Sequence, residues 1–193
     1  MTIGDQRNYW WMYSTGRLSR GRTIVDVDRD YWVRLWTIVD HPQWYEEMRR
    51  SVADEMLSQF TISIKSTPAS MDDIPWCPGV VFASPKVREL LAFCEDQVVW
   101  APARRTGVRP PHAGEFPYFA MLSVHVLSCG KSLPRDPGPL GGARFEVDLE
   151  KVPEGIDIFR ALEKPGRLLV SERVKETLER ARIKKVFFDS PND

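Results

Sequence analysis

The residues with the clearest potential for chemistry are three carboxylates near the N-terminus. Asp26, Asp28 and Asp30 occupy alternate positions of a strand-like segment. Successive side chains of a strand point to opposite faces, so the three carboxylates share one face, where they repel each other unless a cation meets them. Three interpretations stay open: an edge strand protected by charge, a patch facing a basic partner, and a general acid.

A basic stretch follows later in the chain. Arg104, Arg105 and Arg109, together with His112, lie in residues 97–114, which contain no acidic residue. Several prolines in this stretch predict that the strand before it ends at Pro102 and that an extended, protruding loop follows. The loop is either solvated or in contact with a partner or a phosphate group.

Tryptophans crowd the N-terminal part, since five of the seven lie in the first 44 residues. Trp32 and Trp36 share a strand face with Arg34 between them, which suits either a packed core or an interface hot spot. The neighbours Trp10 and Trp11 point to opposite faces of a strand. Both are therefore buried only if both faces of that strand are covered.

Nucleophile and metal patterns are weak. Cys94 lies on an apolar helix face, where it packs as a small hydrophobic residue. His125 and Cys129 share a strand face but would be ~13 Å apart, too far for a direct hydrogen bond. The Cys and His spacings do not match zinc sites, and the glycine-rich stretch 138–142 contains a proline and precedes a strand. We therefore expect a protein that is not an enzyme and holds no metal or cofactor.

Composition limits the remaining classes. The chain has 193 residues, 42% hydrophobic and 28% charged, with 27 basic and 27 acidic side chains. This balance excludes wholesale disorder and a disulfide scaffold, and it argues against a nucleic-acid partner. The start of the chain shows no signal peptide, and no apolar run is long enough to cross a membrane. With three widely spaced cysteines, these features predict a cytoplasmic location without membrane contact.

A repeated pattern predicts the fold. Residues 80–102 and 167–189 align without a gap at an offset of 87 residues, and each reads as strand, serine cap, helix and strand. Ser84 and Ser171 are the expected helix caps. The N-terminal part reads as an aromatic-rich sheet followed by an amphipathic helix from Trp44 to Phe60. The predicted class is α+β, with a mixed sheet and a duplicated strand–helix–strand unit.

Two arrangements of the chain agree with this pattern. Residues 1–66 form an aromatic-rich sheet and helix, and residues 67–193 contain the duplicated region. The alternative is a single continuous domain, which a chain of this length also permits.

Four segments together resemble a known family. They are the strand–helix–strand unit at 80–102, Tyr-Phe-Ala-Met-Leu-Ser-Val-His-Val-Leu-Ser-Cys at 118–129, Asp-Ile-Phe-Arg at 157–160, and Leu-Leu-Val-Ser-Glu-Arg-Val-Lys-Glu-Thr-Leu at 168–178. This order resembles the Imm11 (DUF1629) family of immunity proteins from bacterial polymorphic toxin systems. The C-terminal third is also similar to the related myxobacterial double-CXXCG paralogues, although their paired CXXCG motifs are absent here.

The resemblance implies a protein that neutralises a cognate toxin by stoichiometric binding in the cytoplasm. An enzyme or small-ligand-binding protein with a cleft between the two halves is the main alternative, and an accessory protein of a secretion locus is another. The oligomeric state is left open. The expected partner-binding residues are Asp26, Asp28, Asp30, Trp32, Arg34, Trp36, Arg104, Arg105 and Arg109.

Overall fold

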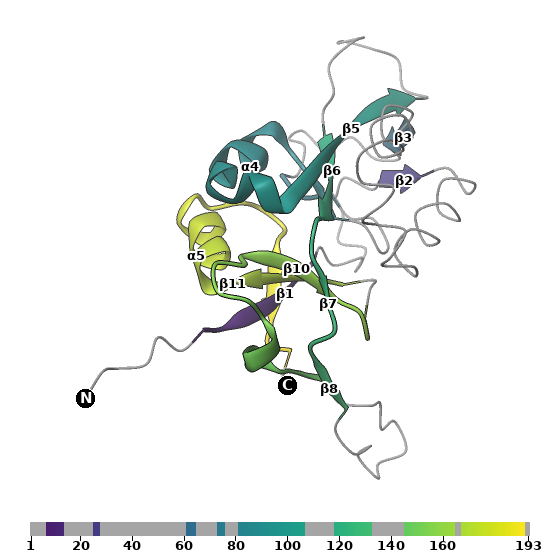
Figure 1. Ribbon diagram of the computed structural model, residues 1–193. Helices are drawn as coiled ribbons and strands as arrows, with labels where there is room; N and C mark the ends of the chain where they lie inside the picture. The colour runs from purple at the N-terminus through teal and green to yellow at the C-terminus, as the bar shows by residue number, and fades with distance from the viewer. Residues whose placement is uncertain are drawn as a thin grey trace, which may run out of the picture.

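The computed structural model confirms the α+β class, with helices packed on mixed sheets (Figure 1). It describes residues 7–13, 25–27, 61–64, 73–75, 81–106, 118–132, 145–164 and 167–191. For 25–27, 61–64, 101–106 and 132 it describes the backbone. Within these ranges no helix is both long and apolar enough to span a membrane.

The described strands form two five-stranded sheets and a two-stranded one. The first has the order β12 (Phe187–Asp189), β1 (Tyr9–Tyr13), β11 (Leu168–Ser171), β10 (Ile158–Ala161) and β7 (Val126–Leu127). The second has the order β2 (Val25–Val27), β3 (Thr61–Ile64), β5 (Val98–Thr106), β6 (Tyr118–Ser123) and β4 (Val81–Ala83). The third pairs β8 (Gly130–Ser132) with β9 (Phe145–Val147). The helices are α4 (Pro85–Leu90) and α5 (Glu172–Arg180), with 3-10 turns η1 (Ala92–Gln97) and η2 (Leu149–Lys151).

Both predicted strand–helix–strand segments have the same topology. β4 and β5 each pair antiparallel with β6, which lies between them. In the same way β11 and β12 each pair antiparallel with β1. Each helix therefore connects two parallel strands that are separated by a third, antiparallel strand. That the two segments arose by duplication, as the 87-residue offset suggests, stays a prediction.

The serine caps form as the sequence predicts. Ser84 and Ser171 have nearly identical backbone angles, with φ of −68° in both and ψ of 162° and 164°. Their hydroxyl oxygens accept from the N–H groups of Val87 and Val174 at 3.4 and 3.3 Å. Each cap satisfies one backbone donor that the first turn of a helix leaves without a partner.

An aspartate holds each cap from behind, which the sequence patterns did not indicate. The backbone N–H of Ser84 donates to the Asp73 carbonyl and that of Ser171 to the Asp157 carbonyl, both at 2.8 Å. Each serine hydroxyl also donates to the carboxylate of the same aspartate. Both aspartates precede a fully buried isoleucine. The two caps are therefore anchored to the core in the same way.

The two segments are also linked across the fold. The buried Gln97 amide oxygen accepts from the N–H groups of Asp157, at 2.7 Å, and of the next residue, at 3.1 Å. Its amide nitrogen donates to the Gly155 carbonyl at 2.9 Å. Lys184, 87 residues after Gln97, donates its backbone N–H to the Asp73 carboxylate at 3.4 Å. Each segment thus contacts the aspartate that anchors the other.

The core has two parts, one on each face of the first sheet. α4 and α5 lie beside each other (Figure 1), with α5 against β11 and β1 of the first sheet and α4 against β4 and β6 of the second. The buried sides of both helices form one core cluster with Met12, Leu168 and Val170. The opposite face, which includes Trp11, packs against β9 and η2. Trp11 is only 3% exposed and Trp10 is half-buried. Both faces are therefore covered: Trp11 is part of the core, and the partly buried Trp10 packs against it from the other face.

Two strand predictions were wrong. β5 does not end at Pro102 but continues to Thr106. Pro102 lies opposite Phe119 of β6, and the pairing of β5 with β3 begins only two residues later, at Arg104. The described sheet therefore has no β3 residue opposite Pro102 that would need a proline N–H as donor. The segment from Tyr118 to Leu127 is interrupted at Val124 and His125, so it is two strands rather than one.

Strand pairing crosses the predicted division at residue 66. β1 pairs with β11 and β12, and β3 pairs in parallel with β5. N-terminal strands therefore complete sheets whose other members come from residues 67–193. The division into two units stays a prediction, and the predicted helix at 44–60 lies outside the described residues.

Candidate functional site

Three predicted partner-binding residues lie in the second sheet. Asp26 in β2 is paired with Ser63 in β3, and Arg104 in β5 is paired with Thr61. Arg105 is the next residue of β5. The sheet thus brings the acidic and basic segments onto strands separated only by β3. The expectation that these two arginines belong to a loop was wrong, because pairing with β3 extends β5 through them.

The remaining predicted residues lie outside the part that the structure describes. They are Asp28, Asp30, Trp32, Arg34, Trp36 and Arg109. Their contribution to partner binding stays a prediction, as do the binding roles of the three residues placed in strands.

The two described cysteines are buried and free. Burial raises the pKa of Cys94 to about 12 and that of Cys129 to about 11. Both thiols stay protonated near neutral pH, whereas a nucleophilic cysteine reacts as the thiolate. Among the described residues, no cluster of three or more His, Cys, Asp or Glu side chains could hold a metal ion.

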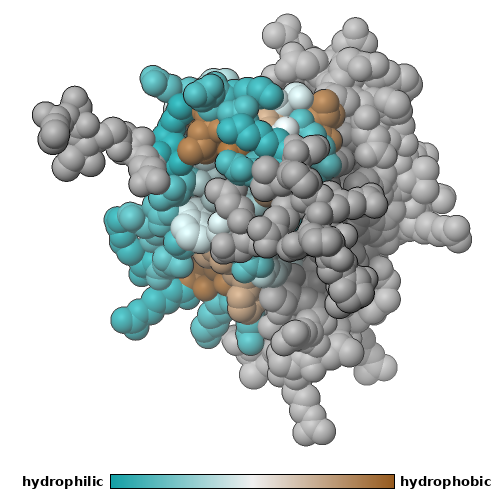
Figure 2. Space-filling view, turned by 90° about the horizontal axis from the view of Figure 1, so that it is seen from below, coloured by the Kyte–Doolittle hydropathy of each residue, from teal (hydrophilic) through white to brown (hydrophobic). Residues whose placement is uncertain are grey.

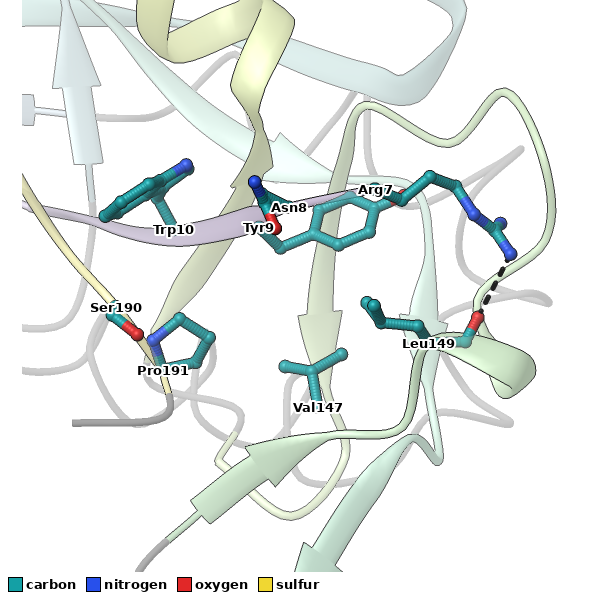
Figure 3. A pocket seen from close by; sticks show the side chains of 8 residues that line it. All are labelled: Arg7, Asn8, Tyr9, Trp10, Val147, Leu149, Ser190 and Pro191. Carbon is teal, nitrogen blue, oxygen red and sulfur yellow. Dashed lines mark hydrogen bonds between the residues drawn. The ribbon is translucent and has the colours of Figure 1, made fainter. Parts of the chain in front are cut away.

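A pocket of about 180 Å³ lies at the start of β1 (Figure 3). The Arg7 guanidinium donates to the carbonyls of Val152 and Leu149, at 2.8 and 3.3 Å. Sites for small molecules usually measure about 300–1,000 Å³, so this pocket has the size of one side chain. Neither His125 nor a carboxylate lines it. The lining residues are Arg7, Asn8, Tyr9, Trp10, Val147, Leu149, Ser190 and Pro191.

A pair of cations lies over aromatic rings at the other end of β1. The Lys164 ammonium is 5.0 Å from the ring centre of Phe145, and the Arg167 guanidinium carbon is 5.6 Å from that of Trp11. The two rings are themselves in contact, with centres 5.2 Å apart. These distances suit cation–π attraction. Lys164 and Arg167 are called the cation pair below.

Neither member of the cation pair forms an ion pair in the described structure. Glu163, next to Lys164, instead accepts a hydrogen bond from the Ser128 hydroxyl at 3.0 Å. Many other described cations do have carboxylate partners. These ion pairs are Arg88–Glu95, Lys131–Asp148, Lys151–Asp148, Arg173–Asp157, Lys175–Glu172 and Arg180–Glu176.

Apolar and aromatic side chains reach the surface near the same end of the sheet. Leu162, in the turn after β10, is 39% exposed, and Phe187 in β12 is 37% exposed. Phe187 stacks on Tyr13, with ring centres 6.1 Å apart. The Asp189 hydrogen bond raises the pKa of Tyr13 and the charge of Arg167 opposes this rise, so Arg167 acts at this end of β1.

Hydropathy varies over the described surface. Seen from below, hydrophobic residues reach the surface in several places among hydrophilic ones (Figure 2). Sequence reasoning missed the cation pair. A signal was present, because Lys-Pro-Gly-Arg at 164–167 is a turn sequence between two predicted strands and places both cations at its ends.

No family model matches the chain, and no curated protein matches it significantly. The resemblance to the Imm11 family therefore rests on the four segments quoted above. In the structure these segments contain β4, β6, β7, β11 and α4, with most of β10 and α5 and the first part of β5, and they include both serine caps. They supply much of the core.

Proposed function

We propose that this chain is an immunity protein that binds a cognate bacterial toxin in a stoichiometric complex and blocks its action. The observation that carries the proposal is the surface at the end of β1 and β10. It combines exposed Leu162 and Phe187 with Lys164 and Arg167, two cations without described carboxylate partners. Apolar anchors beside arginine and aromatic side chains are typical of protein contact surfaces.

The family resemblance supplies the class of partner. An immunity protein acts in the cytoplasm of the cell that makes the toxin, needs no cofactor and performs no turnover. Its binding blocks the active site of the toxin or access of the substrate. The Arg7 pocket, of about 180 Å³, could receive one side chain of a partner.

Co-expression tests the proposal. The gene beside the coding sequence should encode a long protein with a toxin domain, and that domain should stop growth of a bacterial host when expressed alone. Co-expression with this chain should restore growth, and the two proteins should elute together in a fixed ratio. Persistent killing despite soluble expression of both proteins would overturn the proposed function.

A further inference from the structure

The cation pair is held in place before any partner binds. The Lys164 backbone N–H donates to the Ala161 carbonyl at 3.0 Å, and the Arg167 N–H donates to the Lys164 carbonyl at 3.1 Å. The rings below, Trp11 and Phe145, are 3% and 7% exposed. A turn fixed by hydrogen bonds thus positions both side chains over buried rings. Such ordering lowers the entropy that binding must overcome.

Among the described residues, neither cation of the pair forms an ion pair with a carboxylate. Burial lowers the pKa of Lys164, and repulsion by the neighbouring Arg167 lowers it further. Nearby, Lys131 on β8 and Lys151 on η2 both pair with Asp148, at 3.5 and 3.6 Å. A carboxylate supplied by a partner would form ion pairs with the cation pair, as Asp148 does with these two lysines.

The surroundings favour a protein segment over a nucleic acid. Glu163 lies in the same turn, and Asp189 lies at the same end of the sheet, where it accepts from the Tyr13 hydroxyl. The chain as a whole has no net charge. A continuous phosphate backbone would meet these carboxylates, and nucleic-acid sites usually carry a basic excess. A peptide can place one carboxylate on the cation pair and an apolar side chain on Leu162.

We infer that Lys164 and Arg167 bind a carboxylate side chain of an acidic toxin segment, with the exposed Leu162 contacting an apolar neighbour of that carboxylate. The guanidinium of Arg167 offers two parallel donors to the carboxylate, and Lys164 contributes a point charge. This inference rests on the proposed function, and it assigns both the contact site and the chemistry of the partner.

The first experiment measures the affinity for the toxin domain encoded by the neighbouring gene. The variant K164E/R167E should bind at least about tenfold more weakly, because it replaces attraction with repulsion at an interfacial charge pair. The control R182E/K184E makes the same charge change at exposed cations beyond α5. It should alter the affinity less than about threefold, the effect of a charge outside the contact. A second variant, K164M/R167M, removes the charges without adding new ones, and urea unfolding checks that all variants fold.

The outcomes separate the inference from the proposed function. If the wild-type chain and K164E/R167E bind the toxin domain equally well, the inference is overturned and the proposed function stands. If the wild-type chain does not bind it, the proposed function fails. A short peptide with one glutamate beside a leucine and a single-stranded oligothymidylate then decide the inference. Binding of the peptide alone, lost in K164M/R167M, supports it, whereas no peptide binding, or pair-dependent binding of the oligonucleotide, overturns it.

Discussion

Gln97 offers the sharpest test of how the two strand–helix–strand segments hold together. The change Gln97→Met keeps the length and approximate volume of the side chain but removes its three hydrogen bonds, at 2.7, 2.9 and 3.1 Å. Each bond contributes about 1 kcal/mol, so the variant should lose about 3 kcal/mol of unfolding free energy. For a chain of this size that corresponds to a midpoint about 6–12 °C lower. The native state should survive, since domains typically have an unfolding free energy of about 5–15 kcal/mol.

Urea unfolding followed by tryptophan fluorescence gives the free energy directly. Hydrogen exchange adds a local measure, because the amides of Asp157 and Ile158 should exchange faster in the variant. The control Asp96→Asn changes an exposed neighbour on η1 and should alter stability by less than about 0.5 kcal/mol. Leaving even one buried polar group without a partner costs at least about 1 kcal/mol. A smaller loss for Gln97→Met would therefore refute the role assigned to this side chain.

Three further predictions concern single sites. Arg182 directly follows the C-cap residue of α5 and has a φ of 52°, so Arg182→Gly should stabilise the protein by about 0.5–1 kcal/mol in urea unfolding. Cys94 and Cys129, with pKa values of about 12 and 11, should resist alkylation at pH 8 in the native state and react in urea, as read by peptide mass spectrometry. Burial raises the pKa of Tyr9, whose neutral hydroxyl donates to the Ile156 carbonyl. Its stabilising contribution should therefore be complete below pH ~10, the pKa of an unfolded tyrosine, and decline above it, whereas Tyr9→Phe should flatten this decline.

Much of the local structure could be predicted because it depends on neighbouring residues. Ser84 and Ser171 each precede an apolar helical pattern, and hydrogen bonding within one turn decides a cap. The anchoring aspartates could not be predicted in the same way. Asp73 and Asp157 lie 11 and 14 residues before their serines, and only the folded chain brings them together.

The limits of sequence patterns are clearest for Pro102 and the cation pair. Proline usually ends a strand, but β5 continues past Pro102 because β3 pairs with it from Arg104 onward. The local sequence does not reveal this pairing, because it depends on how distant strands assemble. Lys164 and Arg167 are ordinary surface cations in the sequence. They become a candidate site because Trp11 and Phe145, from distant strands, lie beneath them and because no described carboxylate pairs with them.

The position of β1 also bears on when the protein can act after synthesis. Tyr9 pairs with Ser171, so β1 needs a partner strand that the ribosome makes 162 residues later. At about 5–20 residues per second, the ribosome leaves this strand without its neighbours for about 8–30 s. During this interval the apolar side chains of β1, including Trp11, have no sheet to join. The first sheet can therefore form only after Ser171 has been synthesised, and under the proposed function protection of the cell begins no earlier than that.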